Sequence, residues 1–343
     1  MKKVLVVATS SKSRGGIATV VGALRETYMW KEHRCCWIAT HIDSNKLHKV
    51  IKLVFGLLKY MALLPWYDIV HIHLSTSVSA RRKYLFYKLA QLCRKKVVIH
   101  LHCGSQLSDI WNSKYEDMFR NSNMCVVLSN SIRDMVVART NKSDNIRVVY
   151  NPSPSGVVVP KSEERNKEIL FAATLYREKG YLDLIEAFAK ISVKYPDWKL
   201  VLAGNGSQET GIGKAEQLRV GNRVEFLGWV KGADKDRAFR SASIFCLPSY
   251  AEGFPMAVLD AWAYGLPVVT TPVGGVPDIV VNGKNGLLFT PGNVNELAEK
   301  LALLIEDENL RNKISKESLC LVDTTFNSDT IANQLASIYR DIP

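Results

Sequence analysis

The most restrictive feature of this sequence is the run from Cys246 to Gly275, which alternates between strand, loop, helix and strand patterns. Ile244–Leu247 and Val268–Thr271 are short apolar runs, as expected for buried parallel strands. The helix between them begins at Pro255, which is tolerated at a first helical position, and ends at Gly265. The run therefore predicts an α/β architecture in which crossover helices join parallel strands.

Two acidic residues bracket this helix, Glu252 in the loop before it and Asp260 within it. Eight helical residues at ~100° each return to nearly the same azimuth, roughly 12 Å along the axis. Two carboxylates spaced in this way can hold the two ends of an elongated ligand, and the helix N-terminus between them offers N–H groups to a phosphate. For the carboxylates alone, an N-terminal acid and a surface acid on an ordinary helix remain the alternative.

The surrounding residues resemble the donor-site signature of the family-4 retaining glycosyltransferases of the GT-B fold. That signature has a Glu, seven residues and a second Glu, then a Gly-x-Pro-Val turn and a Gly-Gly-x-x-(Asp/Glu) loop. Here it consists of Glu252, Asp260, the turn 265–268 and the loop 274–278. The second acid is Asp260 instead of Glu, so its side chain is one methylene shorter. We expect this to change how far it extends toward a ribose diol and not to remove the contact. The resemblance spans nearly the whole chain and is strongest from about residue 168 to 300.

This resemblance implies two doubly wound Rossmann-like α/β domains that face a central cleft. It implies a retaining hexosyltransferase of bacterial lipopolysaccharide or capsule biosynthesis that needs neither metal nor cofactor. The donor would be a UDP- or GDP-sugar, and the acceptor a lipid-linked saccharide. The implied catalytic residues are Glu252, Lys179 and His102. The implied donor-binding residues are Gly16, Arg177, Gly204, Gly253, Phe254, Met256, Ala257, Val258 and Asp260.

A basic segment, Leu175–Gly180, resembles the Gly-Arg-Leu-x-x-x-Lys-Gly segment of the family, whose Arg and Lys neutralise the donor diphosphate. Lys179 matches the Lys. Thr174 occupies the Arg position, so Arg177 is a conditional substitute. An Arg and a Lys on the surface before a helix are the alternative. Gly15-Gly16 would open a helix over residues 17–30 beside the diphosphate, and the Gly turn after the strand at 200–203 would lie on the nucleotide side.

Two pairs of histidines alternate along predicted strands, so that each pair shares one face. His102, just before Cys103-Gly104, resembles the strand-end His of the family that approaches the donor sugar, with His100 on the same face. His71 and His73 are interpreted as strand-end structure. These histidines could also form a metal site, but no acidic residue lies at a spacing that supports one. The Asp-x-Asp sequence at 234–236 lies in a predicted helix, where such side chains diverge, and is interpreted as a solvated face.

The domain boundary is predicted in the Pro- and Ser-rich linker 151–167. We expect an acceptor-side domain over 1–155 and a donor-binding domain over 156–325. The helix at 326–343 is expected to pack back onto the first domain.

Charge is uneven along the chain. Up to Tyr150 there are 24 Lys and Arg against 9 Asp and Glu, so the first half is strongly basic. Lys46–Leu64 and Arg81–Lys96 combine basic and large apolar residues, which favours contact with an anionic membrane rather than nucleic acid. The alternative is that both are amphipathic crossover helices with a solvated basic face. Without a signal peptide, a transmembrane stretch or paired cysteines, we expect a cytoplasmic protein that is peripheral on the inner face of the cell membrane.

Two other classes of function remain open. A nucleotide-sugar epimerase of the same fold would bind the same donor but need no acceptor. A basic protein that binds membranes or nucleic acid without transferase activity would explain the charge alone.

Overall fold

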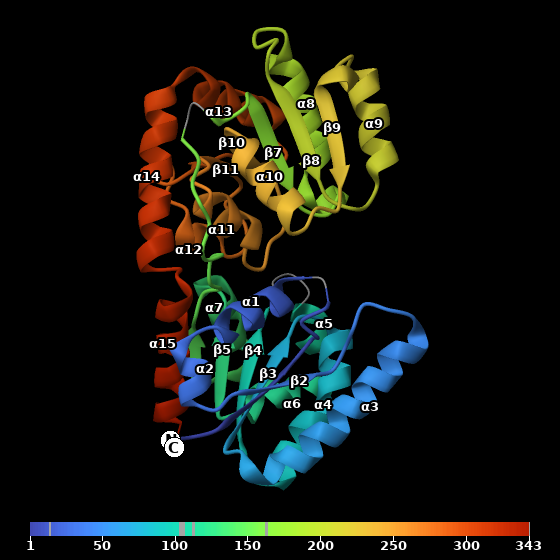
Figure 1. Cartoon of the computed structure of the whole chain (residues 1–343), viewed down its shortest axis with the longest axis vertical. Helices are drawn as coiled ribbons and strands as arrows, with labels where there is room; N and C mark the ends of the chain where they lie inside the picture. Colours follow the sequence, from blue (N-terminus) through green and yellow to red (C-terminus); the bar gives the residue numbers. More distant parts are fainter. Residues whose placement is uncertain (14, 103–106, 112–113, 162–163, 343) are drawn as a thin grey trace. The chain divides into compact units, whose positions relative to one another are not determined.

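The computed structural model describes residues 1–13, 15–102, 107–111, 114–161 and 164–342. The chain folds as two compact units, coloured along the sequence in Figure 1. Unit 1 comprises Met1–Pro152 and Phe326–Pro343, and unit 2 comprises Ser153–Thr325. Unit 2 is therefore continuous in sequence, whereas unit 1 is completed by the last residues of the chain.

Unit 1 is a parallel six-stranded sheet with the strand order β2-β1-β3-β4-β5-β6 and helices on both faces. Its strands are β1 (Val4–Ala8), β2 (Cys36–Ala39), β3 (Ile69–Leu74), β4 (Lys96–Leu101), β5 (Met124–Val127) and β6 (Ile146–Val148). Its helices are α1 (Gly16–Arg25), α2 (Tyr28–Glu32), α3 (Lys46–Leu63), α4 (Ser77–Leu92), α5 (Ser108–Trp111), α6 (Asp117–Arg120), α7 (Asn130–Thr140) and α15 (Ser328–Asp341).

The two faces of this sheet bury different side chains. Alternate residues such as Val70 and Ile99 join the apolar core on the side of α3 and α4. The opposite face carries the histidines of β3 and β4 and is packed by α15, whose Tyr339 side chain bonds to His71. The helix expected at the end of the chain does pack on the first unit, where it also contacts α1 and α2.

Unit 2 has a second parallel sheet, with the strand order β12-β11-β10-β7-β8-β9. Its strands are β7 (Glu168–Ala172), β8 (Lys199–Ala203), β9 (Val224–Gly228), β10 (Ile244–Leu247), β11 (Val268–Thr270) and β12 (Leu287–Leu288). Its helices are α8 (Tyr181–Ser192), α9 (Gln208–Gln217), α10 (Ala233–Ser241), α11 (Met256–Ala263), α12 (Val276–Ile279), α13 (Val294–Glu306) and α14 (Glu308–Thr324), with a 3₁₀ turn at Arg177–Lys179. The predicted fold of two doubly wound α/β sheets is confirmed.

Local details differ from the sequence prediction. The helix expected over 17–30 is divided at Thr27, the residue before α2. Strand β3 continues to Leu74, so both of its histidines lie within the strand. Pro255 caps α11 instead of opening it, because its ψ of 84° is not helical. The chain from Val294 to Asp341 forms three helices, and Asn327 caps the last by accepting from the Thr330 N–H.

Candidate functional site

An ion pair lies beside the carboxyl edge of the sheet in unit 2. Lys179 follows β7 and Glu252 follows the adjacent strand β10, and the Lys179 Nζ–Glu252 Oε1 distance is 2.6 Å. The Ser249 hydroxyl donates to the same Oε1 at 2.6 Å. The Glu252 side chain is only 9% exposed and that of Lys179 is 25% exposed. One carboxylate oxygen is thus fixed by two donors, which orients the other.

Close backbone approaches hold these two loops together. The Tyr250 N–H donates to Glu178 O at 2.8 Å, which joins the loop after β10 to the turn before α8. Gly180 has a φ of +68°, and a Cβ there would lie 2.0 Å from Pro248 O. Gly274 has a φ of +57°, and a Cβ there would lie 1.9 Å from Glu252 O. Only glycine fits either position, so both glycines fix where Glu252 lies.

Helix α11 begins at Met256, four residues after Glu252. The N–H groups of Met256 and Val258 donate to Phe254 O and Pro255 O, and Gly253 O accepts from the Gly275 N–H. Among the described residues, the N–H groups of Gly253 and Ala257 donate to no protein acceptor. Of the expected donor-binding residues here, Val258 and Phe254 are buried, so their contribution is structural or through the backbone.

Asp260 is paired with a lysine that the sequence analysis did not select. Lys235 Nζ lies 2.7 Å from Asp260 Oδ2, and burial raises the pKa of Asp260 despite this neighbour. The prediction that 234–236 is a solvated face is therefore wrong in part, because Asp236 also accepts from the Tyr264 hydroxyl at 3.0 Å. The sequence did indicate the face on which Lys235 lies, because this residue is one helical turn before the buried Phe239. It did not identify Asp260 as the partner.

Arg177 and Gly204 lie at the same edge of unit 2 in different surroundings. Arg177 is exposed and lines a hollow of about 460 Å³ together with Asp183 and Tyr250, whose hydroxyl donates to Asp183. No contact between Arg177 and Lys179 or Glu252 is recorded among the described residues. Gly204 follows β8, and a Cβ there would lie 1.7 Å from Ala173 O. Its absent side chain lets the ends of β7 and β8 meet closely.

Unit 1 carries the two remaining predicted residues. Gly16 is the first residue of α1, after Gly15 at a φ of 110°. His102 follows β4, and its Nε2 lies 2.8 Å from His73 Nδ1. Burial lowers the pKa of His102 to about 3, so its ring is neutral at pH 7. The Cys103-Gly104 loop expected after it lies outside the described residues.

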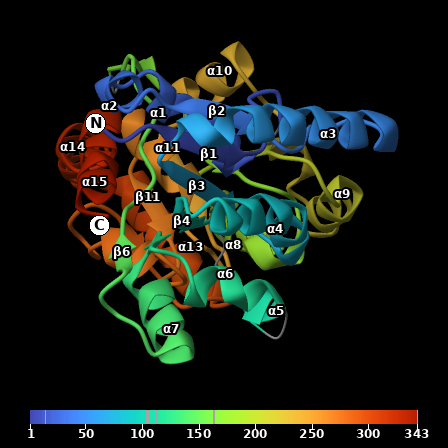
Figure 2. The same cartoon turned by 90° about the horizontal axis from the view of Figure 1, so that it is seen from below.

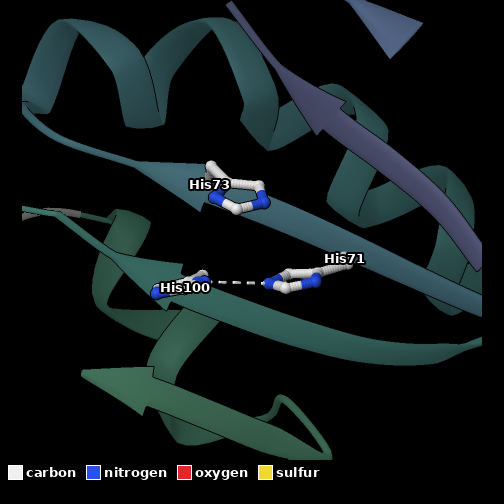
Figure 3. A group of neighbouring side chains, drawn as sticks. All are labelled: His71, His73 and His100. Atoms are coloured by element: carbon white, nitrogen blue, oxygen red, sulfur yellow. Dashed lines mark hydrogen bonds between the residues drawn. The ribbon is translucent and has the colours of Figure 1, made fainter. Parts of the chain in front are cut away.

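The histidines of β3 and β4 form one stacked ladder, of which Figure 3 shows His71, His73 and His100. His73 lies opposite His100 in the strand register. His71 bonds to the Tyr339 hydroxyl at 2.6 Å and to His100 at 3.2 Å. Burial lowers the pKa of His71 to about 3 and that of His73 and His100 well below the ordinary value. The ladder is therefore neutral.

The ring geometry of this ladder does not favour a shared metal ion. The ligand atoms of His71, His73 and His100 lie within 4.8 Å of one another. However, the His71 and His100 planes are 10° apart, and the His73 ring stacks 4.4 and 4.8 Å from them. The rings are therefore nearly parallel, and His71 Nε2 is already paired with His100 Nδ1 at 3.2 Å, whereas a tetrahedral site needs lone pairs that converge on one ion.

The family model described as "Glycosyl transferases group 1" matches residues 158–319, and the model described as "Glycosyltransferase Family 4" matches residues 14–153. Unit 2 thus corresponds to the first model and most of unit 1 to the second. This chain belongs to the glycosyltransferases of the GT-B type.

Individual relatives agree with this membership. An uncharacterized glycosyltransferase of Haemophilus influenzae is 34% identical over 182 residues, which is 52% of this glycosyltransferase and 50% of the relative. The capsular polysaccharide biosynthesis glycosyltransferase CapM of Staphylococcus aureus is 27% identical over 63% of this chain and 60% of its own. The chain thus matches only about half to three fifths of the length of these relatives.

A solved structure shows the same fold over the whole glycosyltransferase. Anabaena HepE in complex with UDP-glucose superposes with a TM-score of 0.78 and 20% identity, covering 99% of this chain and 100% of that one. The predicted GT-B fold is thereby confirmed, and Rossmann-like units of this kind place ligands at the carboxyl ends of their strands.

Proposed function

We propose that this glycosyltransferase moves a hexose from a UDP- or GDP-sugar to a lipid-linked saccharide, with retention of configuration and without a metal ion. The observation that carries the proposal is the Lys179–Glu252 pair beside the N-terminus of α11. The UDP-glucose bound to HepE and the capsule role of CapM support a nucleotide-sugar donor and a surface-polysaccharide product.

The pair supplies two different contacts to such a donor. Glu252 Oε1 already accepts from Lys179 and Ser249, while no described residue donates to its Oε2. That oxygen would accept a hydrogen bond from a hydroxyl of the donor sugar. Lys179 has three ammonium hydrogens, and the one not directed at Glu252 or Ala251 would reach a diphosphate oxygen. The lysine then offsets charge that develops on the leaving diphosphate.

The second acid would serve the nucleoside. Asp260 Oδ2 is held by Lys235, which leaves Oδ1 for a ribose hydroxyl. In a retaining transfer, the bond from the anomeric carbon to the phosphate oxygen breaks and the bond to the acceptor oxygen forms on the same face. The acceptor proton passes to the departing phosphate, so no side chain need act as the base.

The test is a donor screen followed by product analysis. UDP-, GDP- and ADP-sugars are compared by thermal shift, where a ligand at 100 Kd raises the stability by ~2.7 kcal/mol. The stabilising donor is then incubated with a lipid-linked saccharide, with and without EDTA, and the anomeric configuration of the product is read by NMR. An inverted product, a loss of turnover in EDTA or isomerised donor without acceptor would each overturn the corresponding part of the proposal, the last in favour of an epimerase.

A further inference from the structure

Helix α3 in unit 1 exposes an apolar stripe that faces away from its own core. Seven large apolar side chains of this helix are between 40 and 67% exposed: Leu47, Val50, Ile51, Val54, Phe55, Leu58 and Met61. They follow the spacing i, i+3, i+4, i+7, which places them within an arc of about 140° at ~100° per residue. These side chains therefore form one continuous surface, here called the α3 stripe.

The opposite side of α3 is already fully used by the fold. Tyr60 is completely buried and donates to Phe86 O at 2.8 Å, and Leu53 and Leu57 pack against the core of unit 1. Gly56 lies so close to edge strand β2 that a Cβ would be 2.4 Å from Ala39 O. A helix at the rim of a soluble domain normally has one apolar face, whereas α3 has two.

The charged residues of α3 are all lysines. From Lys46 to Trp66 there are four lysines and no acidic residue. With Leu47 placed at 0° on the helical wheel, Lys52 and Lys59 lie at ~120–140°, which is along one border of the α3 stripe. Trp66, just after the helix, is 71% exposed. An apolar face bordered by lysines and an exposed tryptophan has the chemistry of a helix that lies in a membrane interface.

We propose that α3 docks this glycosyltransferase on an anionic bilayer, with the α3 stripe among the lipid headgroups and its lysines against anionic phosphates. The proposal deepens the proposed function, on which it rests for the lipid-linked acceptor. The helix lies on the surface rather than crossing it, since no described helix is long and apolar enough to span a bilayer. Both Figure 1 and Figure 2 show one long side of α3 clear of the other elements of its unit.

A second copy of the chain is a poorer occupant for the α3 stripe. Pairing two stripes would bring the lysines of both helices together without any acid on α3 to offset them. An anionic lipid surface satisfies both features at once, because each lysine near it contributes attraction and the apolar side chains leave water.

The other helix expected at the membrane does not share these features. Lys83 of α4 is completely buried, where its ammonium donates to His73 O and to Ser79 Oγ. Burial lowers its pKa to about 7. The expectation that the basic residues of Arg81–Lys96 contact an anionic membrane is therefore wrong for Lys83, and its replacement would disturb the fold rather than test docking.

The test is co-sedimentation of the full chain with vesicles of phosphatidylcholine alone or mixed with phosphatidylglycerol. The wild type should sediment with the mixed vesicles. Replacement of two stripe residues, Phe55→Ser with Leu58→Ser, should weaken binding by about 10-fold or more, since each loses an apolar side chain buried in the interface. Lys52→Glu with Lys59→Glu, which reverses the two lysines along the border of the stripe, should weaken binding to the anionic vesicles and make the remainder less sensitive to salt.

Matched controls lie in unit 2. Val193→Ser removes an apolar side chain that is 88% exposed, and Lys313→Glu with Lys316→Glu reverses two exposed charges on α14. Both should bind like the wild type. Sedimentation that persists in the stripe variant, absence of wild-type binding at low salt, or a dimer in solution that the stripe variant abolishes would each overturn the proposal. Donor thermal shift in the same variants keeps this outcome separate from failure of the proposed function.

Discussion

The two sheets bury polar side chains differently, one as ion pairs and the other as neutral rings. In unit 2, the carboxyl edge holds charged pairs, Lys179 with Glu252 and Lys235 with Asp260. In unit 1, the sheet face under α15 holds uncharged rings, among them His71, whose bonds are to Tyr339 and His100. In a charged pair at a partly open edge, a ligand can replace one of the two partners. Protonation of a buried neutral ring, by contrast, would leave a charge without a partner and would cost free energy. The carboxyl edge of unit 2 thus keeps partly exposed charges, whereas this face of unit 1 is packed with neutral rings.

The largest expected effect comes from breaking the charged pair. Lys179→Ala should reduce kcat by about 10²-fold or more, because the leaving diphosphate loses a positive partner. Steady-state kinetics with the identified donor measure it. Lys167→Ala is the matched control, since it removes an exposed lysine that pairs with Asp197 in the same unit. Equal turnover in the two variants would contradict the role given to Lys179.

The next effect concerns the neutral ladder at low pH. Because burial lowers the folded pKa of His71 to about 3 while the unfolded value is ~6.5, the unfolded chain binds more protons below pH 6.5. The free energy of unfolding of unit 1 should therefore fall as the pH drops, and His71 alone should account for about 2 kcal/mol at pH 5. Hydrogen exchange in β3 and β4, corrected for intrinsic rates, should accelerate relative to β7 and β8.

His71→Gln tests the assignment of this pH dependence. Glutamine keeps a hydrogen bond for Tyr339 but does not titrate, so the loss of stability between pH 7 and pH 5 should shrink. His48→Gln, at an exposed position of α3, should leave it unchanged. A pH dependence that is identical in all three proteins would show that the ladder is not its source.

A smaller effect is expected at the second charged pair. Asp260→Asn should raise the KM for the donor by about 10-fold and change kcat little, because a ribose contact is made equally in the ground and transition states. Asp234→Asn makes the same charge change at an exposed position of α10 and should have no effect. A fall in kcat without a change in KM would reverse the orientation given to the donor along α11.

The smallest effect is expected at Arg177. Its side chain is exposed and lines the hollow with Asp183, so Arg177→Ala should lower kcat by about 3-fold or less, as for other exposed charges. Arg237→Ala, exposed on α10, is the comparison. A loss approaching that of Lys179→Ala would instead show that Arg177 replaces the arginine missing at Thr174.

Much of this arrangement could be predicted because it depends on local sequence. Strand β10 is a short apolar run whose limits the sequence predicted as they stand in the structure. The gathering of Lys179 and Glu252 at one edge follows from their positions after parallel strands. The roles of both residues in catalysis stay predictions.

What sequence could not supply were partners distant along the chain. Lys235 pairs with Asp260 across 25 positions, and Lys83 is buried because His73 O and Ser79 Oγ accept its hydrogens. Both lysines look like surface residues by type, since lysine is almost never fully buried unless paired. Likewise, the second apolar face of α3 becomes visible only once the first is known to be covered.

The return of α15 to unit 1 has a consequence for synthesis. A ribosome releases the chain from the N-terminus, and domains generally fold as units while they emerge. Unit 2 is continuous, so it can fold as soon as Thr325 has emerged. Unit 1 cannot be completed until Tyr339 arrives, and until then the histidine face of its sheet remains uncovered. The first half of this protein to be made is therefore the last to be finished.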